Sequence, residues 1–251
     1  MLYINETHIG FYILAAIVGL FVGEFIDWMN QRLPEYKKVF TKELFAKNRV
    51  DFKPNYILMI ITSIIYILLL YRYGIQDTFI GNLVLIKYLI LTPMLLSAFV
   101  IDYRLQIIPN RLNLTMAEIG MVIAFLYGIS NVAITIDMLL GMLVGAGIFF
   151  LITAIGALIY GKEALGLGDV KLMGALGLYF GFSNIIIIAM ISFLIGAIIG
   201  IILIAGKIKK SDEYIPFGPF IVIATFISMF VPFNILVSIL MTIFTLGMYK
   251  G

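Results

Sequence analysis

Two aspartates, Asp102 and Asp169, stand at the ends of long apolar segments, where carboxylates are unusual. Ionisable side chains in or beside a membrane span are costly, so each is a functional candidate by default. Two carboxylates at one depth could hydrolyse a peptide bond: one takes a proton from water while its protonated partner hydrogen-bonds the scissile carbonyl. Held close together, like charges favour the sharing of one proton. The pattern predicts acid and base roles for this pair, without assigning which aspartate is protonated.

Two glycines, Gly166 and Gly168, precede the second aspartate and remove side chains from its surroundings. An extended substrate backbone could therefore approach the carboxylate closely. The same glycines could instead simply allow a tight entry into a helix, with Asp169 as its cap and Asp102 as an interface anchor beside Arg104. Taken alone, this pattern leaves both interpretations open.

The composition indicates that these residues belong to a membrane protein. Of the 251 residues, 63% are hydrophobic and only 12% are charged, which excludes an ordinary water-soluble domain. The net charge of +3 is no indication of nucleic-acid binding. Cysteine is absent and the single histidine, His8, stands in a polar N-terminal segment. These counts argue against a disulfide framework, a cysteine zinc site and a histidine-based triad.

Apolar segments long enough to be membrane-spanning helices recur along the chain. We expect an all-α, polytopic membrane protein with eight or nine transmembrane segments. The count is open because Pro232 separates the last two stretches, which could form one span plus a re-entrant piece. The expected spans are residues 9–27, 56–73, 82–101, 112–129, 135–160, 169–182, 185–206, 215–231 and 233–249.

The distribution of basic residues predicts the orientation in the membrane. The short first loop, residues 28–55, carries seven Lys or Arg side chains, which the positive-inside rule places in the cytoplasm. Counting spans from there puts Asp102 and Asp169 at the cytoplasmic boundary. The connections expected on the cytoplasmic side are 102–111, 161–168 and 207–210, while 74–81, 130–134 and 183–184 contain no Lys or Arg.

Four blocks of sequence extend the pattern around the two aspartates. They are Gly23-Glu24-Phe25-Ile26-Asp27 with Arg32-Leu33-Pro34; Asp102 with Ile108-Pro109-Asn110 and Leu112; Glu163-Ala164-Leu165-Gly166-Leu167-Gly168-Asp169-Val170-Lys171-Leu172 with Gly174-Ala175-Leu176-Gly177; and Ile215-Pro216-Phe217-Gly218-Pro219-Phe220. In this order they resemble the type IV prepilin leader peptidase family, the bacterial branch of the GxGD membrane aspartic proteases. Several ordered blocks are far more specific than a lone Gly-x-Gly-Asp.

The resemblance implies an aspartic endopeptidase of the inner (cytoplasmic) membrane. It would cleave the basic leader from type IV prepilins or pseudopilins after a glycine at the cytoplasmic face, with Asp102 and Asp169 as the catalytic pair. We expect a first helix and basic loop in residues 1–55 and the protease domain in residues 56–251. The expected partners are these substrates and membrane lipid, without nucleic acid, and the oligomeric state stays open.

Substrate contacts are expected beside the second aspartate and in the late proline-glycine block. The candidates are Gly166, Gly168, Glu163, Lys171, Pro216 and Gly218. Glu163 and Lys171 could equally form a plain salt bridge at the interface. Pro216 and Gly218 could equally mark a simple interfacial helix start.

Two departures from the family pattern concern cofactors. Many bacterial members have a larger first loop with two Cys-x-x-Cys pairs, a spacing that holds zinc, and many methylate the new N-terminus with S-adenosylmethionine. This chain has no cysteine, and Glu24 and Asp27 stand where the family usually has Ser and Asn. We expect no metal, no cofactor for proteolysis, and S-adenosylmethionine binding only if methyltransferase activity is retained.

Two other functions are alternatives to the peptidase. A proton- or ion-coupled transporter would also use buried carboxylates and glycine-broken helices, but its site is expected near the bilayer midplane between two similar halves. A non-catalytic pilin-assembly factor would bind the same proteins. The presence of both aspartates and both glycines favours the enzyme.

Overall fold

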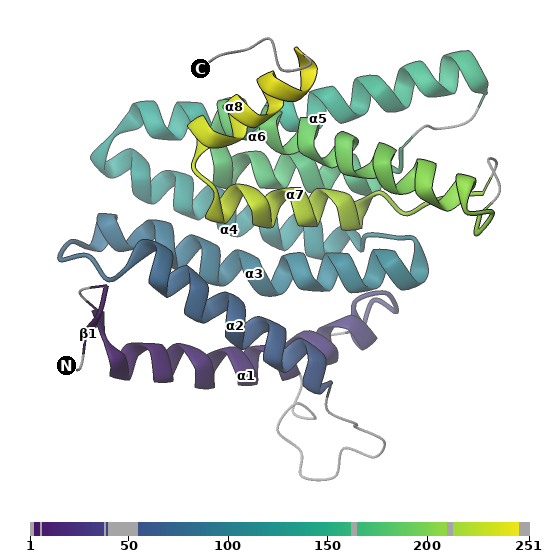
Figure 1. Cartoon of the computed structure of the whole chain (residues 1–251). Coiled ribbons are helices and arrows are strands. Elements are labelled where there is room, and N and C mark those ends of the chain that lie inside the picture. The colour runs from purple at the N-terminus through teal and green to yellow at the C-terminus, as the bar shows by residue number, and fades with distance from the viewer. Residues whose placement is uncertain are drawn as a thin grey trace. The chain divides into compact units, whose positions relative to one another are not determined.

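The computed structural model describes residues 3–5, 7–37, 39, 55–161, 165–209 and 213–245. Within these ranges the chain is almost entirely helical (Figure 1), which confirms the predicted all-α, multi-pass class. A small antiparallel pair of strands, β1 (Tyr3–Ile4) and β2 (Thr7–His8), was not predicted. It turns at Asn5, whose φ is 49° and whose Nδ2 donates to the Tyr71 carbonyl.

Six of the described helices are long and apolar enough to cross a bilayer. They are α1 (Ile9–Arg32), α2 (Tyr56–Tyr73), α3 (Phe79–Leu105), α4 (Asn110–Ser130), α5 (Val132–Tyr160) and α6 (Leu167–Ala205). Two shorter apolar helices, α7 (Gly218–Phe230) and α8 (Phe233–Phe244), follow and are separated at Pro232 as expected. The total of eight or nine membrane spans stays a prediction.

The chain forms two compact units, Met1–Arg104 and Leu105–Gly251, and each is described by itself. The predicted division into residues 1–55 and 56–251 is a functional one and stays a prediction.

In the first unit, glycines bring α1 against α2. A Cβ atom on Gly23 would stand 2.4 Å from the Met59 Cα, so only glycine allows this approach. The third helix is tied to both: the Tyr66 hydroxyl of α2 donates to the Leu89 carbonyl at 2.8 Å, and Ser97 Oγ of α3 bonds Asn30 Oδ1 of α1 at 2.5 Å. The last turns of α3 are therefore held beside the end of α1.

In the second unit, α6 consists of two helical arms rather than one rod. Gly181 interrupts the helix with φ 74° and ψ −179°. Both arms flank the same part of α5, because a Cβ atom on Gly145 would meet the Met173 carbonyl oxygen at 2.5 Å and Ile185 Cγ1 at 2.9 Å. The chain therefore folds back at Gly181, and the arms correspond to the sixth and seventh predicted spans.

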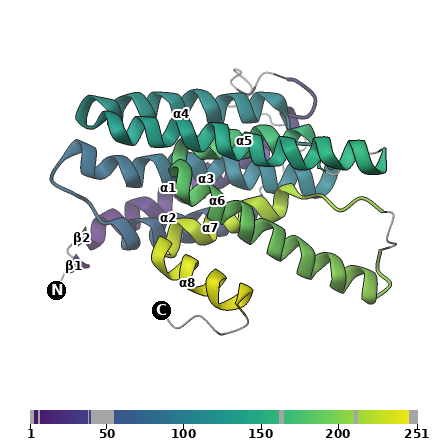
Figure 2. The ribbon, with the colours of Figure 1, turned by 90° about the horizontal axis from the view of Figure 1, so that it is seen from above.

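Further contacts show which connections share one end of this unit. Along α5, Thr153 donates to the carbonyl of Leu165, just before the first arm of α6 begins. The Phe217 ring, just before α7, lies 5.9 Å from Phe149 of α5 and 5.1 Å from Phe193 of the second arm. The starts of α6 and α7 thus lie at the C-terminal end of α5, with Gly181 at the opposite end. Figure 2 shows α4 and α5 side by side along this unit.

Asp137 of α5 holds the turn between the two arms, although sequence analysis gave this carboxylate no role. Its Oδ1 accepts a hydrogen bond from the Phe182 N–H at 3.2 Å. We expect Asp137→Ala to lower the free energy of unfolding by about 1 kcal/mol, because that N–H loses its partner. Thermal unfolding in detergent would measure the change. Asp77→Ala, at an exposed loop carboxylate, is the control, and equal shifts for the two variants would contradict the prediction.

Candidate active site

Asp169 lies in the first turn of α6 and is buried, with 3% of its surface exposed. Its Oδ2 accepts a hydrogen bond from the Gly166 N–H at 3.3 Å, and its own N–H donates to the Gly166 carbonyl at 3.0 Å. The carboxylate thus caps the helix, as one of the two interpretations proposed. A carboxylate has about four lone-pair sites, so this bond uses only part of its acceptor capacity.

The two glycines before Asp169 have different surroundings. A Cβ atom on Gly168 would stand 3.2 Å from the Ile108 Cβ, so this glycine permits close packing against the segment that precedes α4. A Cβ atom on Gly166 would meet nothing nearer than Asp169 Oδ2, at 3.5 Å, and the Tyr214 hydroxyl, at 3.8 Å. Gly166 could therefore accept a Cβ atom at ordinary van der Waals distance from the carboxylate, whereas Gly168 is more tightly packed.

Two side-chain hydrogen bonds join the start of α4 to the start of α6. Asn113 Nδ2 donates to the Gly168 carbonyl at 3.0 Å, and Lys171 Nζ donates to Asn110 Oδ1 at 2.7 Å. Sequence analysis had not singled out Asn113. A polar side chain one turn after Asn110, on the way into an apolar span, is the signal that could have found it.

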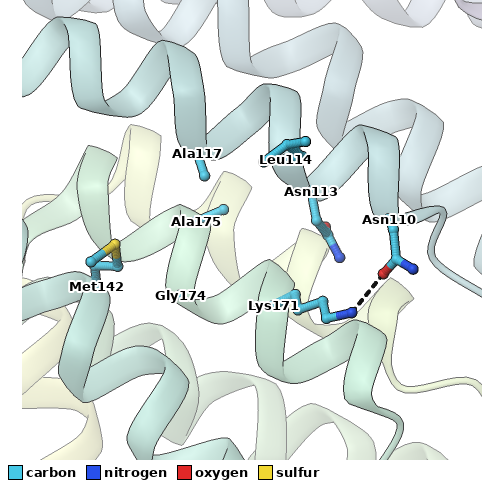
Figure 3. Close-up of a pocket in the computed structure, with 8 residues that line it drawn as sticks. All are labelled: Asn110, Asn113, Leu114, Ala117, Met142, Lys171, Gly174 and Ala175. Carbon is cyan, nitrogen blue, oxygen red and sulfur yellow. Dashed lines mark hydrogen bonds between the residues drawn. The ribbon is translucent and has the colours of Figure 1, made fainter.

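Lys171 lies on the side of α6 away from Asp169, because two residues turn a helix by about 200°. It borders a pocket of about 390 Å³ between α4, α5 and the first arm of α6 (Figure 3). The lining residues are Asn110, Asn113, Leu114, Ala117, Met142, Lys171, Gly174 and Ala175. The pocket therefore lies on the side of α6 opposite to Asp169. A contact between Lys171 and a substrate leader stays a prediction.

The other predicted contact residues fall in two places. Glu163 lies outside the described residues. Pro216 and Gly218 flank Phe217, the residue that precedes α7, and the Phe217 ring packs against α5 and the second arm of α6. This places the proline-glycine block at the same end of the unit as Asp169.

Asp102 belongs to the other unit, in the last turn of α3, and is also 3% exposed. A solvated interface anchor would leave its carboxylate in water, so the burial favours a functional role. Arg104, two residues on, is exposed. Because each unit is described by itself, the pairing of Asp102 with Asp169 stays a prediction.

The residues that depart from the family pattern lie in α1. Asp27 is 9% exposed, and its Oδ2 accepts a hydrogen bond from Gln31 Nε2 at 2.9 Å. Among the described residues, no group of three or more His, Cys, Asp or Glu side chains could hold a metal ion. The expectations about zinc and S-adenosylmethionine stay predictions.

Long apolar helices with buried aspartates at their ends define the class of this protein: a multi-pass membrane protein with buried carboxylates at the ends of apolar helices. Comparison with known proteins makes the assignment more specific. Residues 89–201, which include Asp102 and Asp169, match the model of the Type IV leader peptidase family, and this part of the chain belongs to that family.

Several curated relatives share the name prepilin leader peptidase/N-methyltransferase. The protein from Xanthomonas campestris pv. campestris is 32% identical over 193 residues, covering 74% of this chain and 63% of the relative. The protein from Pseudomonas aeruginosa is 34% identical over 141 residues, 56% of this chain and 48% of the relative. The chain spans between about half and just under two thirds of these relatives. No solved structure is a significant match.

Proposed function

We propose that this chain is a membrane aspartic endopeptidase that cleaves the basic leader from type IV prepilins or pseudopilins after a glycine. The observation that carries the proposal is the buried Asp169 carboxylate in the first turn of α6, beside Gly166 and within the region that matches the Type IV leader peptidase family. The relatives' names support the substrate class.

In the proposed reaction, Asp102 and Asp169 act as acid and base. One carboxylate takes a proton from water, whose oxygen attacks the scissile carbonyl, while the protonated partner hydrogen-bonds the carbonyl oxygen. Breakdown of the tetrahedral intermediate breaks the C–N bond and gives the leaving amine a proton. No cofactor is needed in this scheme, because the two carboxylates supply the general acid and the general base.

The arrangement of the second unit supports cleavage at one membrane face. The starts of α6 and α7 lie together at the C-terminal end of α5. We infer that this end faces the cytoplasm of an inner-membrane protein, because the connections predicted there carry the basic residues. A substrate whose basic leader is held in the cytoplasm would present its junction with the apolar stem at this depth.

The relatives are also named as N-methyltransferases, and this second activity is considered separately from cleavage. Asp27 is buried and bonded to Gln31, and together with Glu24 it departs from the family's Ser and Asn. We propose that N-methylation is absent or carried by other residues. The chain would then need S-adenosylmethionine only if other residues carry the methylation, and not for cleavage.

One experiment tests cleavage and methylation together. Purified protein in detergent is mixed with a prepilin-like substrate and labelled S-adenosylmethionine, and the products are analysed by mass spectrometry. We expect a single cut after glycine and an unmethylated new N-terminus. Labelled methyl on the product would exclude the absence of methylation and would show that residues other than the family's Ser and Asn carry it. No cut in several prepilins would overturn the peptidase proposal and favour a binding or transport role.

A further inference from the structure

Asn113 belongs to α4 and is buried beside the start of α6. It contacts the peptide unit that joins Gly168 to Asp169. Its side chain is 3% exposed, and its Nδ2 donates to the Gly168 carbonyl at 3.0 Å. We propose that Asn113 is a positioning residue that fixes the Asp169 carboxylate for catalysis. This inference rests on the proposed peptidase function.

The bond acts on the backbone from which Asp169 extends. The Gly168 carbonyl and the Asp169 N–H belong to one planar peptide unit. Asn113 holds the carbonyl side, while the N–H side donates to the Gly166 carbonyl at 3.0 Å. Ile108 packs against Gly168 as well. With both sides of the peptide held, the direction of the Asp169 side chain is restricted.

The orientation of the Asn113 amide follows from its neighbours. Its Oδ1 is buried with no hydrogen-bond partner among the described residues. Turning the amide over would set Oδ1 against the Gly168 carbonyl, so two acceptors would face each other. A leucine of similar size would avoid a buried unpaired oxygen. If Asn113 served only to fill space, its buried unpaired oxygen would make it less stable than leucine. The hydrogen bond that its Nδ2 donates to Gly168 is therefore the feature that distinguishes asparagine from leucine at this position.

The second tie between α4 and α6 is the weaker restraint. Lys171 and Asn110 are both exposed, and their bond lies at the rim of the pocket (Figure 3). Exposed bonds of this kind contribute little because water competes for both groups. Asn113 lies one helical turn further in and is only 3% exposed, so water competes less for its amide.

The test compares Asn113→Leu and Asn113→Asp with wild type in prepilin cleavage. We expect Asn113→Leu to lower kcat about 10- to 100-fold with KM within about threefold, because the catalytic group is misplaced while substrate contacts persist. In Asn113→Asp only a protonated carboxyl can donate to Gly168. Its activity relative to wild type should therefore fall as the pH rises, whereas that of Asn113→Leu should not change with pH.

A matched control comes from Asn184, which lies just after Gly181 at the start of the second arm of α6. Asn184 Nδ2 also donates to a backbone carbonyl, that of Phe180, at 3.0 Å. We expect Asn184→Leu to leave kcat within about twofold of wild type. An equal loss of kcat in this variant, or an unchanged kcat in folded Asn113→Leu, would overturn the proposal. So would a flat relative pH profile for Asn113→Asp.

Amide hydrogen exchange separates this inference from the proposed function. Asn113→Leu should raise exchange at residues 165–172, and Asn184→Leu should not, because the tie to Gly168 is lost only in the first. If the wild type cleaves no prepilin, the proposed function fails while exchange still decides whether Asn113 holds this turn. Unchanged exchange in Asn113→Leu would overturn the positioning role independently of activity.

Discussion

Asp169→Asn is expected to lower kcat/KM for leader cleavage by roughly 100- to 10,000-fold while the protein stays folded. The asparagine oxygen can still accept the Gly166 N–H bond that Asp169 Oδ2 accepts at 3.3 Å, so the helix cap survives. The amide cannot take up or release the proton that hydrolysis requires. Initial rates of cleavage, with thermal unfolding as a check on folding, measure both parts of the prediction.

Asp102→Asn should cause a loss of similar size, because neither half of an acid-base pair replaces the other. For the same reason the double variant should be no worse than either single one. Asp77→Asn, at an exposed loop position, is the control and should cleave at the wild-type rate. Wild-type processing by Asp169→Asn would remove this residue from catalysis. Losses that multiply in the double variant would indicate independent roles.

Gly177→Ala is expected to destabilise the protein by about 2–3 kcal/mol, which is the largest stability effect we predict. A Cβ atom at Gly177 would stand 2.2 Å from the carbonyl carbon and oxygen of Gly141 on α5. Both contacts are backbone, so no side chain can rotate away and the two helices must separate. Thermal or denaturant-induced unfolding in detergent would measure the change.

Gly147→Ala is the matched control, because it adds the same methyl group to a helical glycine of α5 that has nothing within 4 Å of the added atom. It should be neutral or stabilising by about 0.5–1 kcal/mol, since alanine favours helix. Equal destabilisation by both variants would show that the close approach at Gly177 does not hold α6 in place. A large effect at Gly177 alone would show that glycine packing supports the helix that carries Asp169.

Hydropathy determined most of the fold, because a membrane span must be a long apolar helix with its backbone hydrogen bonds satisfied internally. The expected span at residues 56–73 coincides with α2, and Pro232 separates α7 from α8 as predicted. The short β1–β2 pair was missed because two-residue strands leave no periodic pattern. The fold-back at Gly181 lies two residues before the predicted gap at 183–184, which was the only sign of it in the sequence.

The sequence by itself also determined the candidate residues of the site. Asp102 and Asp169 stand out because carboxylates are rare beside apolar spans, and the glycines next to Asp169 identify a backbone that can be approached closely. These inferences depend on local spacing and composition, which a linear pattern contains. The ordered blocks that match the family carry the same kind of information.

Only the tertiary structure decided how these residues are held. It distinguishes the two glycines, with Gly168 packed tightly against Ile108 and Gly166 beside the carboxylate in less tight packing. It places Lys171 away from Asp169, and it brings Asn113 to the Gly168 carbonyl across 55 positions of sequence. Such contacts depend on the packing of α4 against α6, and the direction of a side chain across a helix interface is set by that packing rather than by spacing along the chain.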